Sequence, residues 1–313
     1  MSDQYDIVIR GGTIVDGTGN PPYRGDVAIL GDRIAAVGEV IGRARQEIDA
    51  TGMKITPGFV DVHTHYDGQV TWENRLAPSS NHGVTTVVMG NCGVGFAPTR
   101  AEDHELVIKL MEGVEDIPEV VMTNGVPWGW ETFPEYLDFL DTREADVDFA
   151  AQLPHSPLRV YVMGERGAEM EPPTADDLAQ MRRLTKEAVE AGALGVTTSR
   201  QLAHRFRDGR SAPSVYSELD ELKALAAGLR DAGDGVFQLV PATNKHSADE
   251  WKVIDALSQT SGRPVNFSLF TGPTTLGGPQ PLLDGLAQAK AEAGPRTLFI
   301  AVVYETATAA LHR

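Results

Sequence analysis

The chain has 313 residues, of which 42% are hydrophobic, and its formal net charge at pH 7 is −17. Nucleic-acid phosphates and anionic lipids would repel this charge, so we expect neither a nucleic-acid partner nor a membrane partner. We expect a cytoplasmic protein, because the N-terminus lacks the features of a signal peptide, no apolar run is long enough to span a membrane, and the single cysteine excludes an internal disulfide.

The N-terminal region, residues 1–56, is predicted to form a small antiparallel β-module. Three short runs rich in β-branched residues, Asp6–Ile9, Asp26–Ile29 and Arg33–Val37, are separated by glycine- and proline-rich turns. Taken alone, such a module indicates no specific function.

From residue 57 the pattern changes to strands that alternate with helices. Thr174 and Asp177 resemble a capping box at the start of a helix. Alternating βα units form a parallel sheet, and seven units in series favour a barrel over an open sheet. Residues 57–313 are therefore predicted to form an α/β barrel of the (β/α)8 TIM type. Strands are predicted near residues 59–63, 84–89, 147–152, 193–198, 235–240, 264–269 and 297–303, and the clearest helices over 174–191, 218–232 and 248–260.

The count of predicted strands is one short of a closed eight-stranded barrel. The chain ends at Arg313, soon after the seventh predicted strand. We therefore expect a truncated version of a longer protein, with unpaired edges on its first and seventh strands. Such edges favour aggregation or assembly into a homo-oligomer, and we expect the chain alone to have little activity.

The first predicted barrel strand follows a Pro57-Gly58 turn and ends in His63-Thr64-His65. Side chains two residues apart on a strand share a face, so the two imidazoles are expected to project together and to bind one metal ion. Two histidines in this spacing are more often ordinary polar residues at a strand end. Here the apolar run before them and the turn favour the metal site.

Cys92 lies where the second predicted strand ends, in the sequence Gly90-Asn91-Cys92-Gly93. The carboxyl ends of parallel barrel strands meet at one edge, so Cys92 is expected to converge with the two histidines. A thiolate and imidazoles suit Zn²⁺. The alternative is a buried cysteine that acts as a small apolar side chain.

These two segments resemble the amidohydrolase superfamily of metal-dependent hydrolases. Residues 57–65 resemble its first barrel strand, and residues 84–93 resemble the second strand of its N-acyl-D-amino-acid deacylase (D-aminoacylase) branch; the resemblance continues to about residue 270. It implies a barrel with an N-terminal β-sandwich half and one or two zinc ions, one fitting the residues present better. It also implies hydrolysis of a linear amide, in an N-acyl amino acid, by metal-activated water, with His63, His65 and Cys92 holding the metal.

Four further residues follow predicted strands. His155 is a candidate catalytic residue that contacts substrate or water, or else a turn histidine bonded to backbone. Arg159 and Arg200 are candidates to clamp a substrate carboxylate, or else they satisfy carbonyl groups. His204 is either a pocket residue on a lid or, as favoured here, a surface residue. An acidic run that holds Glu115 is expected to be a solvated face without a catalytic role.

The chain departs from the family pattern at the fifth and sixth strands, each of which delivers a histidine to the tightly held zinc. Val240 and Leu269 align with those two positions, and neither side chain can bind a metal. No lysine lies at the end of the fourth strand to bridge two metals, and the catalytic aspartate expected after an eighth strand would lie beyond Arg313. Two alternatives therefore stay open: a non-catalytic homologue with a degenerate metal site, and a cyclic amidase of the hydantoinase or dihydroorotase kind. Cys92 and the missing lysine argue against the second.

Overall fold

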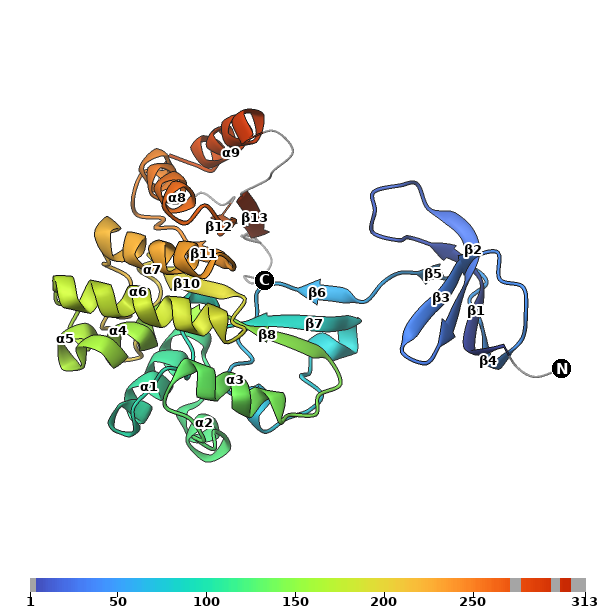
Figure 1. The fold of residues 1–313 in the computed structure, drawn as a ribbon, viewed down its shortest axis with the longest axis horizontal. Coiled ribbons are helices and arrows are strands. Elements are labelled where there is room, and N and C mark those ends of the chain that lie inside the picture. Colours follow the sequence, from blue (N-terminus) through green and yellow to red (C-terminus); the bar gives the residue numbers. More distant parts are fainter. Residues whose placement is uncertain (1–3, 271–276, 294–298, 305–313) are drawn as a thin grey trace, which may run out of the picture. The chain divides into compact units, whose positions relative to one another are not determined.

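The structure is a computed structural model that describes residues 4–270, 277–293 and 299–304 (Figure 1). The chain divides into two compact units, Met1–Phe59 and Val60–Arg313. Among the described residues, no helix is long and apolar enough to cross a membrane.

The first unit is one five-stranded sheet with the order β3-β2-β1-β4, in which β5 also pairs with β1. The hairpin partners β1, β2 and β3 are antiparallel, whereas β4 and β5 run parallel to β1. The predicted antiparallel module is therefore a mixed sheet, and its small core is formed by Val8, Ala28 and Val40. The strands are β1 (Tyr5–Ile14), β2 (Tyr23–Leu30), β3 (Arg33–Gly38), β4 (Ala44–Asp49) and β5 (Lys54–Ile55).

In the second unit, each of the seven predicted barrel strands has a counterpart. One sheet has the order β6-β7-β8, and the other has the order β13-β12-β11-β10-β9, with its strands parallel. The third predicted strand is split into β8 and β9 at Gln152, whose backbone N–H still donates to the carbonyl of Met89 in β7. The strands are β6 (Phe59–Asp61), β7 (Val84–Met89), β8 (Asp148–Ala151), β9 (Leu153–Pro154), β10 (Gly195–Ser199), β11 (Val236–Val240), β12 (Val265–Phe270) and β13 (Phe299–Tyr304).

Helices follow the strands, as the alternating pattern predicts. The three clearest predicted helices are confirmed as α6, α7 and α8, and both hydrogen bonds of the Thr174–Asp177 capping box are present at the start of α6. The α-helices are α1 (His104–Glu115), α2 (Glu119–Gly125), α3 (Phe133–Asp141), α4 (His155–Met163), α5 (Glu165–Ala168), α6 (Ala175–Glu190), α7 (Leu219–Ala232), α8 (Ser247–Ser261) and α9 (Gln280–Ala293). Four single turns of 3-10 helix are η1 (Gln69–Thr71), η2 (Ser79–His82), η3 (Asn91–Gly93) and η4 (Ala101–Asp103).

Strand β10 is completely buried, and its first residue must be glycine. All five of its residues are buried, as expected for a parallel strand that is covered on both faces. At its first residue, a Cβ added to Gly195 would lie 1.8 Å from the carbonyl oxygen of Val236, so only glycine fits between β10 and β11. The tight pairing of β10 and β11 sets the strand ends near which the candidate site lies.

Candidate metal centre

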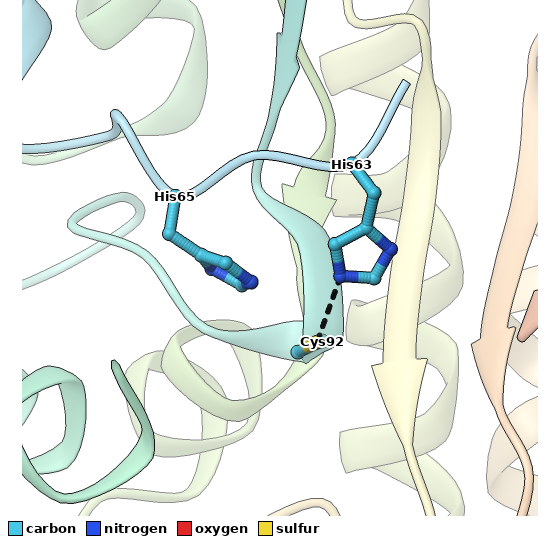
Figure 2. Close-up of side chains that lie close together, drawn as sticks. All are labelled: His63, His65 and Cys92. Atoms are coloured by element: carbon cyan, nitrogen blue, oxygen red, sulfur yellow. Dashed lines mark hydrogen bonds between the residues drawn. The ribbon is translucent and has the colours of Figure 1, made fainter. Parts of the chain in front are cut away.

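The two histidines of the predicted site follow β6 instead of ending it. The predicted strand over residues 59–63 stops at Asp61, and the chain continues in an irregular segment. That segment stays beside β7 because the backbone N–H and the hydroxyl of Thr64 both donate to the carbonyl of Val88, at 3.0 and 2.7 Å. His63 and His65 flank this anchored residue, and their rings point into the same space (Figure 2).

Cys92 is presented by a tight left-handed turn after β7. Gly90, Cys92 and Gly93 have φ values of 81°, 57° and 68°. A Cβ on Gly90 would lie 2.1 Å from the carbonyl oxygen of Gln152, so this position requires glycine. A left-handed conformation at a residue other than glycine costs about 1–3 kcal/mol and is concentrated at functional sites, as here at Cys92.

Asn91 ties the cysteine turn to the histidine segment. Its side-chain amide donates to the carbonyl oxygens of Thr64, at 3.3 Å, and Val88, at 2.9 Å. The side-chain oxygen of Asn91 accepts a hydrogen bond from Gln152 at 3.3 Å. One buried amide therefore links the end of β7, the histidine segment and the residue before β9.

The structure brings His63, His65 and Cys92 together. One ligand atom from each lies within 4.8 Å of the others, and Nε2 of His63 lies 3.2 Å from Sγ of Cys92 (Figure 2). Ligands around one tetrahedral zinc ion, with bonds of about 2.0–2.3 Å, are about 3.3–3.8 Å apart. The donor set and its spacing therefore fit a zinc ion after small side-chain adjustments.

Burial sets the protonation of this group. It lowers the pKa of His63 to about 4 and, together with the charges of His63 and His204, lowers the pKa of His65 well below its usual value. Both imidazoles are thus neutral, which is the form that binds metal. Burial raises the pKa of the Cys92 thiol, so metal binding would release its proton.

Glu115 contacts the cluster at His65, although the sequence pattern assigned it to a solvated face. It is the last residue of α1, and its Oε1 lies 3.2 Å from Nε2 of His65. Burial, with the charges of Asp67 and Asp116, raises the pKa of Glu115 to about 8. No local signal in the acidic run distinguishes Glu115 from its neighbours, because its position depends on how α1 packs.

Two further groups lie near the site: Asp67, which the sequence analysis did not name, and His204, for which it favoured a surface position over a pocket position. Asp67 is 3% exposed, and burial raises its pKa to about 7; in the described part of the chain its Oδ2 is buried without a hydrogen-bond partner. The surface interpretation of His204 is wrong, because its Nδ1 is buried and likewise has no hydrogen-bond partner among the described residues. Burial and the charge of His63 lower the pKa of His204 to about 4.

The expected contact of His155 with substrate or water is not supported. His155 begins α4 and is fully buried. Its Nδ1 lies 2.8 Å from the hydroxyl of Thr198, and its Nε2 lies 3.1 Å from Oε1 of Glu221. Both ring nitrogens therefore have protein partners, and the residue has a structural role between α4, β10 and α7.

The two arginines proposed as substrate clamps are also engaged within the protein. Arg159 lies in α4 and pairs with both carboxylate oxygens of Glu221, and its Nε and Nη2 atoms donate to the backbone carbonyls of Gly167 and Glu171. Arg200, just after β10, pairs with the carboxylate of Glu250 at 3.1 Å and donates to the carbonyl of Ser217. Each arginine neutralises a buried glutamate, which leaves neither free to bind a substrate carboxylate.

Contacts at β10 identify which side chains of the neighbouring strands face the barrel interior. The hydroxyl of Thr197 accepts a hydrogen bond from the backbone N–H of Gly93, so Thr197 faces the cysteine turn. Gln238 in β11 is in register with Thr197, and Val240 lies two residues further along the same face. Val240 therefore lies on the interior face, as its alignment with the family predicts.

Leu269, which aligns with the sixth-strand position of the family, does not face the interior. The ring of Phe267 in β12 contacts Trp251 of α8, with 6.4 Å between ring centroids, so Phe267 faces the helices. Leu269, two residues later, shares that face. Because Leu239 is in register with Phe267, Ser268 lies beside Val240 on the interior face. The sixth-strand position nearest the site is thus a buried serine.

Comparisons with known proteins identify the family. The family described as "Amidohydrolase family" matches residues 46–313. This chain belongs to the amidohydrolase family. It is 36% identical over 200 residues to D-aminoacylase of Alcaligenes xylosoxydans xylosoxydans, which covers 63% of this chain and 38% of that protein. It is 31% identical over 245 residues to N-acyl-D-glutamate deacylase of the same organism, covering 75% of this chain and 46% of that protein.

Solved structures of the family have the same fold. A structure described as showing the role of the binuclear metal centre in D-aminoacylase superposes with a TM-score of 0.73 and 27% identity, over 96% of this chain and 58% of that one. N-acyl-D-glutamate deacylase from Bordetella bronchiseptica, complexed with zinc and a phosphonate inhibitor, superposes with a TM-score of 0.68 and 25% identity, over the same shares. L-Hydantoinase from Arthrobacter aurescens, at a TM-score of 0.51 and 16% identity, shares the fold alone. This amidohydrolase spans less than half the length of the curated relatives it matches.

Proposed function

We propose that this amidohydrolase uses one zinc ion, held by His63, His65 and Cys92, to hydrolyse a linear amide bond. The observation that carries the proposal is the convergence of the three ligand atoms within 4.8 Å at the ends of β6 and β7. A buried thiol beside two neutral imidazoles is a donor set that binds zinc in preference to magnesium or calcium.

A bound zinc ion supplies Lewis acidity, which lowers the pKa of water to about 7 and polarises a carbonyl group. The residues of the chain supply the geometry. The Thr64 hydrogen bonds hold the two imidazoles on one side of the segment, and the turn around Cys92 presents the thiol toward them. Asn91 links both segments, so the donors are preorganised by buried hydrogen bonds.

We propose an N-acyl amino acid as the substrate. D-Aminoacylase, N-acyl-D-aspartate deacylase and N-acyl-D-glutamate deacylase are all among the relatives of this chain, at 31–36% identity. All three names describe an enzyme that removes the acyl group from an N-acyl-D-amino acid. The arginines Arg159 and Arg200 are occupied by buried glutamates, so the substrate carboxylate would be bound by other groups.

Metal content and hydrolysis measured on the same purified protein test this proposal. We expect about one zinc ion per chain by inductively coupled plasma mass spectrometry, and release of acetate from N-acetyl-D-amino acids. Cys92→Ser and His63→Ala should each lower zinc affinity by roughly 100-fold or more, because even outer-shell partners of a metal contribute roughly 10–100-fold.

His82→Ala is the matched control, since His82 is an exposed histidine in η2, outside the cluster. It should leave zinc content and hydrolysis unchanged. Equal zinc content in the wild-type protein and in Cys92→Ser would show that the ion, if present, is bound elsewhere.

A non-catalytic homologue is the second candidate function. It is favoured by the interior face of β11 and β12, because Val240 and Ser268, each one residue past the register pair Leu239 and Phe267, provide no imidazole. The same experiment separates the two functions. Stoichiometric zinc at the cluster without release of acetate, under conditions in which a full-length D-aminoacylase is active, would support the non-catalytic function.

A further inference from the structure

The carboxylate of Glu115 contacts His65, one of the three proposed ligands. We propose that Glu115 is a fourth protein ligand of the metal ion, supplied by helix α1 and not by a barrel strand. This inference rests on the proposed metal site, and it adds a ligand that the resemblance to the family does not imply.

The geometry of His65 places Glu115 there. The ring of His65 points toward His63 and Cys92, and Nε2 lies at the tip of an imidazole ring (Figure 2). Oε1 of Glu115 lies 3.2 Å from this Nε2, which equals the distance between Nε2 of His63 and Sγ of Cys92. Both separations are just below the value of about 3.3–3.8 Å for two ligands of one tetrahedral zinc ion. A zinc ion held by His65 and Glu115 together would require these two atoms to move apart by roughly a few tenths of an ångström.

Helix α1 is fixed in the position that this role requires. Gly113 packs against the loop after β10 so closely that an added Cβ would lie 2.2 Å from the carbonyl oxygen of Arg205. In the same loop, Arg207 pairs with Glu112 at 2.6 Å. The helix ends at Glu115, because Asp116 adopts a left-handed conformation with φ of 56°. These contacts hold the last carboxylate of α1 beside His65, whereas Glu112 is already paired with a cation.

The charges of the cluster favour a carboxylate ligand. Two neutral imidazoles and one thiolate would leave a bound Zn²⁺ with a net charge of +1 in a mostly buried site, and burying an unbalanced charge is costly. Addition of the Glu115 carboxylate makes the site neutral.

A second and independent observation points to a cation in this region. Oδ2 of Asp67 is buried without a hydrogen-bond partner in the described part of the chain. A divalent cation in this region would supply the partner that this oxygen lacks among the described residues.

Zinc affinity and the Co²⁺ absorption spectrum of the full chain test the role of Glu115. Competition with a chromophoric chelator gives the affinity, and the ligand-field bands of Co²⁺ report the number and kind of its ligands. Glu115→Gln keeps the size and removes the charge, and it should lower zinc affinity by roughly 10–100-fold or more and change the ligand-field bands. Glu115→Asp, which retains a carboxylate, should recover part of the affinity.

Glu105→Ala is the matched control, because Glu105 is an exposed residue in the first turn of the same helix. It should behave like the wild-type protein in both measurements. Circular dichroism of the metal-free proteins would verify that each variant is folded.

Three results would overturn the inference, and the first two are distinguishable from failure of the metal site itself. Wild-type affinity and spectrum in Glu115→Gln, together with weakened binding in Cys92→Ser, would remove Glu115 from the ligand set and keep the site. Lower affinity with an unchanged spectrum would show that Glu115 only orients His65. Unchanged binding in both variants would refute the proposed site as well.

Discussion

Replacement of Glu221 by glutamine tests whether His155 and Arg159 form a structural cluster instead of a substrate site. Glu221, His155 and Arg159 are 1%, 0% and 2% exposed. Glu221 accepts hydrogen bonds from Arg159 through both carboxylate oxygens and lies 3.1 Å from Nε2 of His155. Glutamine removes the negative charge and leaves the Arg159 guanidinium buried without compensation.

The size of the effect follows from this burial. Breaking one partner of a buried ion pair costs about 3–5 kcal/mol, because the remaining charge is left in a low-dielectric interior. For a unit of this size, a loss of about 1 kcal/mol lowers the melting temperature by about 2–4 °C, so Glu221→Gln should lower it by about 6–20 °C.

Urea unfolding followed by tryptophan fluorescence measures this loss. Asp231→Asn is the matched control, since Asp231 lies on the same helix, α7, and its pair with Arg182 is solvent-accessible. That variant should cost about 1 kcal/mol or less. If Glu221→Gln were no less stable than Asp231→Asn, the structural role would be refuted. The signal reports the second unit alone, because all four tryptophans lie in it: Trp72, Trp128, Trp130 and Trp251.

Three further predictions use the same methods. Burial alone would raise the pKa of Glu221, but its partners outweigh burial and lower the pKa from 4.5 to about 2. The stabilisation by ionised Glu221 is therefore fully present above about pH 4.5 and is lost as the pH falls toward 2. The difference in urea midpoint between wild type and Glu221→Gln should accordingly shrink below pH 4.5. A difference that stays constant with pH would contradict this. Val240→His combined with Ser268→His should raise zinc affinity in chelator competition. Val240→His combined with Leu269→His should bind zinc no more tightly than Val240→His alone. Tighter zinc binding by the Leu269→His double variant than by the Ser268→His double variant would show that the strand register is misassigned. Thr174→Ala removes the cap of α6 and should lower the free energy of unfolding by about 1 kcal/mol in urea titration, and no change would indicate that the capping bonds are not formed in solution.

The sequence predicted the strands and helices of the second unit well because their signals are local. Strand and helix periodicity placed seven barrel strands and the helices α6, α7 and α8. The capping pair Thr174 and Asp177 acts over three residues, so it could be identified without tertiary information. The convergence of His63, His65 and Cys92 also followed from sequence, because parallel barrel strands carry their carboxyl ends to one edge.

The sequence could not predict properties that depend on long-range packing. Glu115 approaches His65 only because α1 ends against the loop after β10, and an acidic run contains no signal for that contact. Burial of His155 and Arg159 depends on Glu221, more than 60 residues away in the chain.

The face of a strand residue is the sharpest case. An alignment located β12 correctly, but a shift of one residue moves a side chain from the barrel interior to the helix layer, since the side-chain period of a strand is two. The sequence by itself thus determined the family, the strand order along the chain and three candidate ligands. Tertiary structure alone decided that Ser268 faces the site instead of Leu269, and that Glu115 reaches it, because both depend on contacts between segments far apart in sequence.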